Sequence, residues 1–504
     1  MPKINGYPKL TAQEAAERIP DGATVAFSGF SNAGTAKAIP RALAVRARTL
    51  HQSEVPFKIR VLTGGACGGS VDELLAQSEA ISWRAPYQSA PTLRKQINQQ
   101  KVEYLDMHLS GVGRTVLSGF FGKLDVAVIE ATDVTPDGRV YLSSSIGVSP
   151  TFLRCAEHVL IELNSYHSRR LPEMHDIVIM DPPPRRQPTP IHDPLTRMGF
   201  PYAVVDPKKI IGIVETDEPD HIPSVSVPSA VNYKIAEHVV QFFLKEMETG
   251  HIPKEFLPLQ AGVGKTANGV MEALGSHPDI PPFKMYTLAI HDWLVRLMEQ
   301  GKLLGASASS LSLTPAMLNR VYENMDYFVS RIVLRPQEIS NDPGVVRRLG
   351  VIAMNSAIEV DIYGNVNSSH VFGTDMVNGI GGSGEFTRNS FLSVMMVPSI
   401  ARGGRISNVV PMCPHIDSNE HSVQIIVTDQ GLADLRGLGP MQRAKRIIEN
   451  CAHPAYREYL FKYIEQSRSG HIRHNLDTCY ELHINLMEHG AMLPDLDLST
   501  ISEN

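Results

Sequence analysis

Short apolar runs recur along the first part of the chain, and most of them are unbroken rather than alternating. Unbroken runs of this length are typical of strands that are buried on both faces, as in parallel sheets. Segments with a helical pattern lie between them. Strands are predicted at 23–30, 58–65, 124–131, 158–164 and 209–216, and helices at 35–50 and 71–80. This alternation predicts an open, mostly parallel α/β sheet.

A second series of strands follows a proline-rich stretch at 217–234. Between them lies 235–248, which predicts a helix because Val239, Phe242, Phe243 and Met247 fall on one face. The new strands are predicted at 284–290, 351–364, 390–399 and 422–429, and a second proline-rich stretch, 181–194, is expected on the surface. We therefore expect two α/β domains, residues 1–225 and 226–504, which join near 220–233.

The composition narrows the class of protein. The chain has 504 residues, of which 43% are apolar and 20% charged, and its formal charge is −6. This balance is that of a globular protein and argues against a nucleic-acid or membrane-surface partner. No apolar run approaches the roughly 20 residues that span a bilayer. The five cysteines are scattered, so reduced thiols and a cytoplasmic location are expected.

Two glycine-rich motifs resemble nucleotide-binding loops. "GVGKT" (262–266) resembles the end of a P-loop, but Leu259 stands where the first glycine is required, so a tight turn before a helix is favoured. "GIGGSG" (379–384) matches the spacing of a dinucleotide-binding loop without the preceding strand or the later acid. A sharp packed turn and a pocket lined by backbone amides both remain open for it.

Other polar groups have simpler interpretations. His415, Asp417, Glu420 and His421 could bind a metal, but their segment is better explained as a hairpin turn. The serines of "SSSIGVSP" (143–150) lack a nucleophile-elbow pattern and predict a polar loop. Cys67 is expected as a small buried residue rather than a reactive thiol. For His291, which follows a strand, packing or capping is favoured.

Both halves of the chain contain a turn of small residues that leads into a helix. These turns are "FSGFSNAGTAKAIPRAL" and "LQAGVGKTANGVMEAL". Backbone N–H groups at such turns can approach a ligand, and a helix N-terminus favours an anion. The residues alone therefore predict an anionic small-molecule ligand without naming it.

Several long motifs resemble the acetyl-CoA hydrolase/CoA-transferase family, which includes succinyl-CoA:acetate and propionyl-CoA:succinate CoA-transferases. The matching stretches run from about residue 20 to 460 and include "SGFSNAGTAKAIPRAL", "APTLRKQIN", "LQAGVGKTANGV", "LRPQEISNDPGVVRRLGVIAMNSAIEVDIYG" and "VVPMCPHIDSNEHSVQIIVTDQGLADLRGLGP". The resemblance implies two α/β domains with an active-site cleft between them, the acyl-CoA site being carried by the C-terminal domain. It also implies a CoA thioester as substrate, a small-molecule acceptor, a homodimer, no metal and no permanently bound cofactor.

The resemblance further implies a glutamate nucleophile and donors that stabilise oxyanions. The glutamate would pass through an acyl anhydride to an enzyme–CoA thioester, which is covalent catalysis in two easier steps. Carried over, the donors and binding glycines are Gly262, Val263, Gly264, Asn341, Gly382 and Gly384. This reading favours the amide-lined pocket for 379–384.

This chain departs from the family pattern at the nucleophile. The family segment T/S-E-x-x-x-D corresponds to 287–292, where Leu288 replaces the glutamate and His291 replaces the usual glutamine. No other glutamate lies between Glu272 and Glu299 to take its place.

Three functions remain open in consequence. The favoured one is direct acyl transfer from CoA to an acceptor or water, with His291 as acid/base. The others are ordinary CoA transfer through another carboxylate, such as Glu385 or Asp292, and acyl-CoA binding without catalysis.

Overall fold

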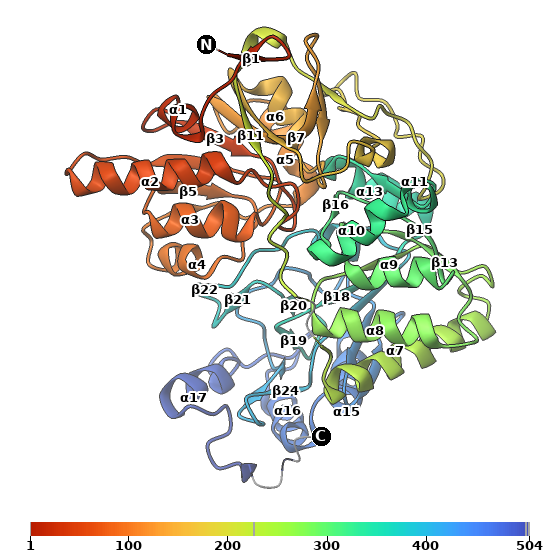
Figure 1. Cartoon of the computed structure of the whole chain (residues 1–504). Coiled ribbons are helices and arrows are strands. Elements are labelled where there is room, and N and C mark those ends of the chain that lie inside the picture. The colour runs from red at the N-terminus through yellow and green to blue at the C-terminus, as the bar shows by residue number, and fades with distance from the viewer. Residues whose placement is uncertain (1, 225–226, 499–500, 502–504) are drawn as a thin grey trace. The chain divides into compact units, whose positions relative to one another are not determined.

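The computed structural model describes residues 2–224, 227–498 and 501 of the chain (Figure 1). The chain forms two compact units, each built from separate segments. Unit 1 comprises Met1–Val225, Lys284–Leu349 and Asn378–Glu385, and unit 2 comprises Ser226–Phe283, Gly350–Val377 and Phe386–Asn504. The domain limits expected from the sequence, 1–225 and 226–504, stay a prediction. Within each unit the secondary structure is mixed α/β, and most strand pairs in the larger sheets are parallel, which confirms the predicted fold class.

The main sheet of unit 1 has nine strands in the order β10-β8-β7-β3-β4-β5-β6, with β9 beside β7 and β11 beside β9. All of its pairs are parallel except β7–β8 and β8–β10. The five strands predicted before residue 217 are confirmed as β3, β4, β7, β9 and β11. The strands of this segment are β1 (Lys3–Ile4), β2 (Tyr7–Pro8), β3 (Thr24–Phe27), β4 (Ile59–Leu62), β5 (Ile81–Ala85), β6 (Glu103–Tyr104), β7 (Val126–Val134), β8 (Arg139–Leu142), β9 (His158–Asn164), β10 (Ala203–Val204) and β11 (Ile210–Thr216).

Helices cover this sheet because each has one apolar face. Figure 1 shows α2, α3 and α4 layered in the red-to-orange part of the chain. Ile39 and Leu43 of α2 join Val25 and Phe27 of β3 in one buried cluster. The helices are α1 (Ala12–Glu17), α2 (Ala38–Gln52), α3 (Asp72–Gln77), α4 (Pro91–Asn98), α5 (Leu109–Leu117) and α6 (Ser149–Cys155).

The segment 284–349 contributes further strands and helices to unit 1. Its strands β15 and β17 are parallel neighbours, as are β14 and β16. The strands are β13 (Phe283–Tyr286), β14 (Ala289–Ile290), β15 (Leu303–Ala308), β16 (Ser310–Leu311) and β17 (Ile332–Leu334). The helices are α9 (Asp292–Glu299), α10 (Pro315–Glu323), α11 (Met325–Val329), α12 (Gln337–Ser340) and α13 (Pro343–Leu349).

Unit 2 contains strands in the order β12-β18-β23-β27-β28, of which only the last pair is antiparallel. The run predicted as one strand at 351–364 forms two, β18 and β19, because the chain bends at 357–358. The strands are β12 (Leu259–Ala261), β18 (Ile352–Ser356), β19 (Glu359–Asp361), β20 (Val366–Asn367), β21 (His370–Val371), β22 (Asp375–Met376), β23 (Leu392–Met396), β24 (Ile400–Ala401), β25 (Ile406–Ser407), β26 (Val409–Val410), β27 (Ile425–Thr428) and β28 (Gly431–Asp434). The remaining helices are α7 (Ala230–Glu248), α8 (Lys265–Ser276), α14 (Ser383–Asn389), α15 (Pro440–Asn450), α16 (Pro454–Gln466) and α17 (Glu481–His489).

The proline-rich stretch 181–194 contains no helix or strand and is mostly exposed, as predicted. Arg348 holds it through hydrogen bonds to the carbonyl oxygens of Thr189 and Ile191. Across the described residues, none of the helices combines the length and apolar character needed to span a bilayer.

The loop after β3 is tied to the sheet by the buried ammonium of Lys37. The Nζ atom lies 2.5 Å from Glu130 Oε2 on β7 and 3.0 Å from Asp220 Oδ1, which follows β11. Burial opposes ionisation of Glu130, but Lys37 and His167 outweigh it and hold the pKa of this carboxyl below its usual value. The network therefore joins three segments that are distant in the sequence.

A second buried carboxylate fixes the start of α2. Lys37, at the N-cap of this helix, provides no side-chain cap. Glu162 of β9 instead accepts hydrogen bonds from the backbone N–H groups of Lys37, Ala38 and Ile39 at 2.8, 3.1 and 2.6 Å. These are donors that a helix cannot satisfy internally.

We expect Lys37→Met to destabilise unit 1 by about 3–5 kcal/mol, because it leaves buried carboxylates without their cation. The loss should be largest near neutral pH. It should shrink toward about pH 4, where carboxyl groups in the unfolded chain begin to bind protons and the unpaired buried carboxyls can remain neutral. The measurement is the denaturation midpoint at several pH values.

The matched control is Lys123→Met. The Lys123 ammonium pairs with Asp125 and Glu157 on an exposed surface, so no measurable shift is expected. Equal shifts for the two variants would contradict the structural role of Lys37.

Candidate functional site

Leu288 lies just after β13, as the sequence predicted for the strand end. Its side chain is half-buried in a bend between β13 and β14. The bend is held by two backbone hydrogen bonds, from Thr287 N to Ser307 O at 2.9 Å and from Ser309 N to Leu288 O at 2.8 Å. The position of the side chain is therefore set by neighbouring parallel strands, and open α/β sheets bind their ligands at such strand ends.

Leu288 and Asn341 both lie against Gly382. A Cβ atom built on Gly382 would be 2.5 Å from Leu288 Cδ2 and 2.6 Å from Asn341 Nδ2. Only glycine fits such a contact without a shift. The Asn341 side chain is fully buried at the end of α12, where its Oδ1 accepts a hydrogen bond from Ser340 Oγ at 2.9 Å. Three of the residues expected at the site are thus brought together within unit 1.

The glycine loop 379–384 is a packed turn, held by a segment that sequence reasoning missed. Tyr104 donates a hydrogen bond to the Asn378 carbonyl at 2.7 Å, and Asp106 accepts one from Ile380 N at 2.7 Å. Gly379 has a φ of 138°, and a Cβ there would meet both side chains within 2.7 Å.

The residues that follow Asp106 also contact the end of the glycine loop and Glu385 after it. The ring of His108 lies beside Gly384, where a Cβ would be 2.7 Å from Cε1. Ser110 N donates to Glu385 Oε1 at 2.8 Å. The contacts come from every second residue, 104 to 110: the chain is extended up to His108, and Ser110 lies in the first turn of α5. The alternation of polar and apolar residues in "YLDMHLS" was the available sequence signal.

The two carboxylates considered as replacement nucleophiles have different surroundings. Asp292 accepts hydrogen bonds from Thr314 N and Oγ1 at 2.9 and 2.6 Å, so it anchors the chain before α10. Glu385 is only 4% exposed, and its Oε2 accepts a hydrogen bond from Asn341 Nδ2 at 3.0 Å. Burial raises the pKa of Glu385 to about 7, although the hydrogen bonds from Ser110 and Asn341 oppose this shift.

His291 occupies the N-cap of α9, three residues after Leu288. Burial lowers the pKa of its imidazole, and the Ser312 backbone and Asp292 only partly oppose this. The ring is therefore neutral near pH 7. In the described part of the chain its Nε2 is buried without a hydrogen-bond partner.

Gly262, Val263 and Gly264 belong to unit 2, where they form the turn between β12 and α8. The tight turn predicted for this motif is confirmed. Gly262 N bonds to Met354 O at 2.9 Å, and Gly264 is the N-cap of α8 with a φ of 124°. The Val263 side chain is 66% exposed, so this turn lies on the surface of its unit.

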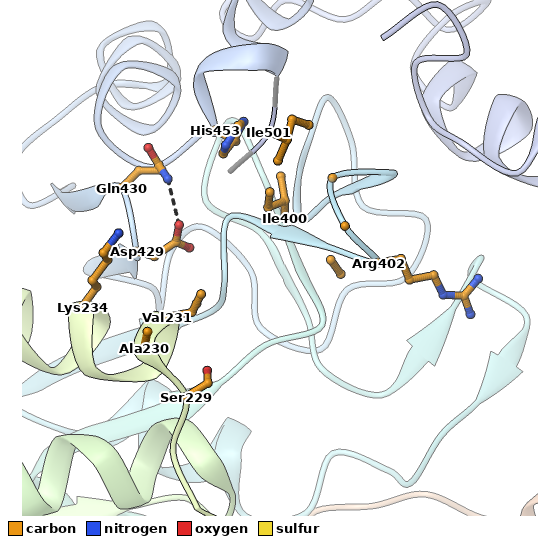
Figure 2. A pocket seen from close by; sticks show the side chains of 13 residues that line it. Ser229, Ala230, Val231, Lys234, Ile400, Arg402, Asp429, Gln430, His453 and Ile501 are labelled. Atoms are coloured by element: carbon orange, nitrogen blue, oxygen red, sulfur yellow. Dashed lines mark hydrogen bonds between the residues drawn. The ribbon is translucent and has the colours of Figure 1, made fainter. Parts of the chain in front are cut away.

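Unit 2 also contains a polar cavity of about 360 Å³, shown in Figure 2. Lys234 and Arg402 are its cationic side chains, and Arg402 projects away from the other labelled residues. Asp429 is already engaged by Ser399 N at 2.6 Å and by the Gln430 amide. The lining residues are Ser229, Ala230, Val231, Lys234, Ile400, Ala401, Arg402, Gly403, Gly404, Asp429, Gln430, His453 and Ile501.

The remaining sequence candidates have structural roles. Cys67 is buried, and burial raises the pKa of its thiol, which disfavours the reactive thiolate. Ser143 and Ser144 donate hydrogen bonds to Glu130 and Asp220. Asp417 accepts hydrogen bonds from Ser368 and Ser369 and so anchors a turn; the segment 413–421 is a loop rather than a hairpin.

One group of potential metal ligands occurs among the described residues: Glu130, His167 and Asp220, all of them buried. Lys37 Nζ already lies within 3.0 Å of both carboxylates. Burial would lower the pKa of this amine, but Glu130 and Asp220 outweigh it and raise the value, so the lysine stays charged. The cation of this cluster is an ammonium, and the residues do not fit a metal ion as well.

Two family profiles match this chain. The acetyl-CoA hydrolase/transferase N-terminal domain matches residues 2–215, and the C-terminal domain matches residues 318–464. The chain belongs to the acetyl-CoA hydrolase/transferase family. Together the two matches include Asn341 and Gly382, while Leu288 lies between the matched ranges.

Members of this family are similar to the chain over nearly its whole length. The propanoyl-CoA:succinate CoA transferase of Escherichia coli is 53% identical, over 97% of this chain and 99% of the relative. The succinyl-CoA:acetate CoA-transferase of Clostridium kluyveri is 41% identical, over 96% and 90%. The crystal structure of RipA from Yersinia pestis shares the fold, with a TM-score of 0.70 and 20% identity over 90% of this chain and 96% of RipA.

We expect Gly382→Ala to displace Leu288 or Asn341, because its Cβ has no room between them. Overpacking of this kind costs about 1–3 kcal/mol. Adding Leu288→Ala removes the Cδ2 atom and should recover part of the loss. A double-mutant cycle on unfolding free energies measures this coupling. Gly69→Ala, whose Cβ meets nothing within 4 Å, is the control. Strictly additive effects of the two substitutions would argue against the contact.

Proposed function

We propose that this family member uses an acyl-CoA thioester and transfers the acyl group directly to a bound acceptor or to water. No covalent enzyme–CoA intermediate forms. The observation that carries the proposal is the leucine at 288, whose side chain lies against Gly382, as does the Asn341 amide. A hydrocarbon side chain cannot form the acyl anhydride that the glutamyl route requires.

The retained groups support stabilisation of a tetrahedral oxyanion. Asn341 Nδ2 carries two hydrogens, of which one is donated to Glu385. The second hydrogen and the Gly382 N–H are the donors that meet the thioester oxygen as negative charge develops. Removing one such donor typically costs 10²–10³ in kcat. Gly384 keeps the glycine loop compact against His108.

His291 is the acid/base of this reaction. Its neutral imidazole takes the proton of the attacking water as the oxygen bonds to the carbonyl carbon. The C–S bond then breaks, and the imidazolium returns the proton to the CoA thiolate. The lowered pKa of His291 supports the role of base near neutral pH. A cytoplasmic homodimer stays a prediction.

A second candidate is ordinary CoA transfer between a short acyl-CoA and a carboxylate such as acetate or succinate. Two observations favour it: relatives up to 53% identical are named CoA-transferases, and Glu385 lies one hydrogen bond from Asn341. In this case a carboxylate elsewhere in the chain would carry CoA, since residue 288 is a leucine.

Exchange of label separates these functions. With acetyl-CoA and labelled acetate but no other acceptor, a ping-pong enzyme releases acetate as the enzyme–CoA thioester forms and so exchanges the label into acetyl-CoA, whereas direct transfer does not. Direct transfer consumes acetyl-CoA only in the presence of its acceptor or by hydrolysis. A protein that binds acyl-CoA without catalysis shows neither reaction.

We expect His291→Ala to lower kcat by about 10²–10⁴-fold, the usual contribution of a general acid/base. The KM for acyl-CoA should change little, because binding rests on other groups. Steady-state kinetics over pH 6–9 provide the measurement. Full activity in the variant would reject the role of His291.

We expect Leu288→Glu to gain a covalent CoA adduct and some CoA transfer to carboxylates. The gain should be small, because burial raises the pKa of the new carboxyl and a misplacement of about 1 Å costs on the order of 10²-fold. Mass spectrometry after incubation with acetyl-CoA measures the adduct on the intact protein. Leu288→Gln is the matched control, since its amide has the same shape and no nucleophilic oxygen anion. An adduct on the wild-type chain would instead favour the second candidate.

A further inference from the structure

Glu385 connects the candidate site to the segment that holds the glycine loop. Each of its two carboxylate oxygens accepts a hydrogen bond. Oε2 accepts one from Asn341 Nδ2 at 3.0 Å, and Oε1 accepts one from Ser110 N at 2.8 Å. Glu385 is 4% exposed and Asn341 is fully buried. The pair is therefore fixed by hydrogen bonds that water does not readily replace.

We propose that Glu385 is a positioning residue for Asn341: its carboxylate takes one amide hydrogen and thereby directs the other toward Gly382 and Leu288. The proposal rests on the proposed function, in which that second hydrogen meets the thioester oxygen. It assigns to Glu385 a role through Asn341 rather than contact with the substrate.

The orientation of the Asn341 amide follows from its partners. A carboxylate can only accept hydrogen bonds, so the group that faces Glu385 must be the NH₂ end. The opposite end, Oδ1, accepts from Ser340 Oγ at 2.9 Å. Since a Cβ on Gly382 would be 2.6 Å from Nδ2, the same nitrogen also faces the space above this glycine. The NH₂ end of the amide thus donates one hydrogen to Glu385 and directs the other toward the site.

Protonation of Glu385 reverses this arrangement. A hydrogen on Oε2 would oppose the Asn341 N–H, and relief requires the amide to turn and present Oδ1 instead. Burial raises the pKa of Glu385 to about 7, with Asp342 adding to the shift and Ser110 and Asn341 opposing it. The ring of His108 also lies nearby, beside Gly384. Ionised Glu385 is the positioning form, so activity should fall as pH drops below about 7.

Glu338 provides a matched control within the same unit. It lies three residues before Asn341, is 3% exposed, and burial likewise raises its pKa to about 7. In the described part of the chain neither of its carboxylate oxygens has a hydrogen-bond partner. Its Oε2 lies beside Gly113, where a Cβ would be 3.0 Å away. Glu338 therefore shares the burial of Glu385 and lacks the bond to Asn341.

The first experiment compares pH profiles of kcat for acetyl-CoA consumption from pH 5.5 to 8.5. The wild type and Glu338→Gln should both lose activity on the acidic side with a midpoint near 7. Glu385→Gln should lose this limb, because its amide does not titrate. Its kcat should be lower by about 10–10²-fold at pH 8 with little change in KM, consistent with a misplaced donor. Glu385→Asp, which keeps the charge on a shorter side chain, should retain the limb at reduced kcat.

Two kinetic outcomes would overturn the proposal. One is an acidic limb that persists in Glu385→Gln. The other is a limb that disappears in Glu338→Gln as well as in Glu385→Gln. A covalent CoA adduct on Glu385 would also overturn it, because Glu385 would then be a nucleophile.

The second experiment does not depend on turnover. Neutron crystal structures of Glu385→Ala and of the wild type at pH 8 and pH 5.5 distinguish the Asn341 Nδ2 and Oδ1 atoms and show which of them faces Gly382. The NH₂ end should leave the Gly382 side in the variant and at pH 5.5, and keep it in the wild type at pH 8. An unchanged Asn341 in all three overturns the positioning role. If the wild type turns over no acyl-CoA, the proposed function fails, and these structures still decide whether Glu385 orients Asn341.

Discussion

Unit 1 depends on the buried ammonium of Lys37. A charge that is removed from water is stable only when it is paired and its hydrogens are used, and here two carboxylates from distant segments share it. The pairing fixes the loop after β3, the middle of β7 and the chain beyond β11 at one point. Glu162 adds the cap of α2 beside them. The strand ends that shape the first half of the fold are therefore held by electrostatics as well as by the apolar core.

The candidate site uses a different constraint, which is the absence of a side chain at 382. Leu288 and Asn341 approach this glycine so closely that any larger residue must move one of them. Tyr104, Asp106 and His108 contact the glycine loop through their side chains, and Ser110 binds Glu385 through its backbone N–H. In the proposed function, the leucine at 288 removes the covalent step, while Asn341 and Gly382 supply the oxyanion donors.

Much of the fold could be predicted because parallel strands buried on both faces are marked by continuous apolar runs. The strands β3, β4, β7, β9 and β11 each correspond to such a run. The break between β18 and β19 was missed, since an apolar run does not show where its backbone bends. Long motifs were enough to predict the family, whereas the assignment of Leu288 to the family's nucleophile position stays a prediction. The contacts of residues 104–110 with the glycine loop were overlooked, because this loop lies nearly three hundred residues further along the chain. The alternation of polar and apolar residues does not indicate which segment they contact.

The sequence by itself determined the α/β class, the family, and the absence of a carboxylate at residue 288. These properties follow from the types of residues and their order, which the sequence states without any knowledge of contacts in space. Only the tertiary structure decided which polar groups meet. It showed that Asp292 accepts hydrogen bonds from Thr314 and that Glu385 accepts one from Asn341. It also showed that Glu130 and Asp220, the possible metal ligands, form ion pairs with Lys37. The physical reason is that hydrogen bonding and ion pairing act over about 3 Å in space, whereas the partners are separated by tens to hundreds of residues along the chain.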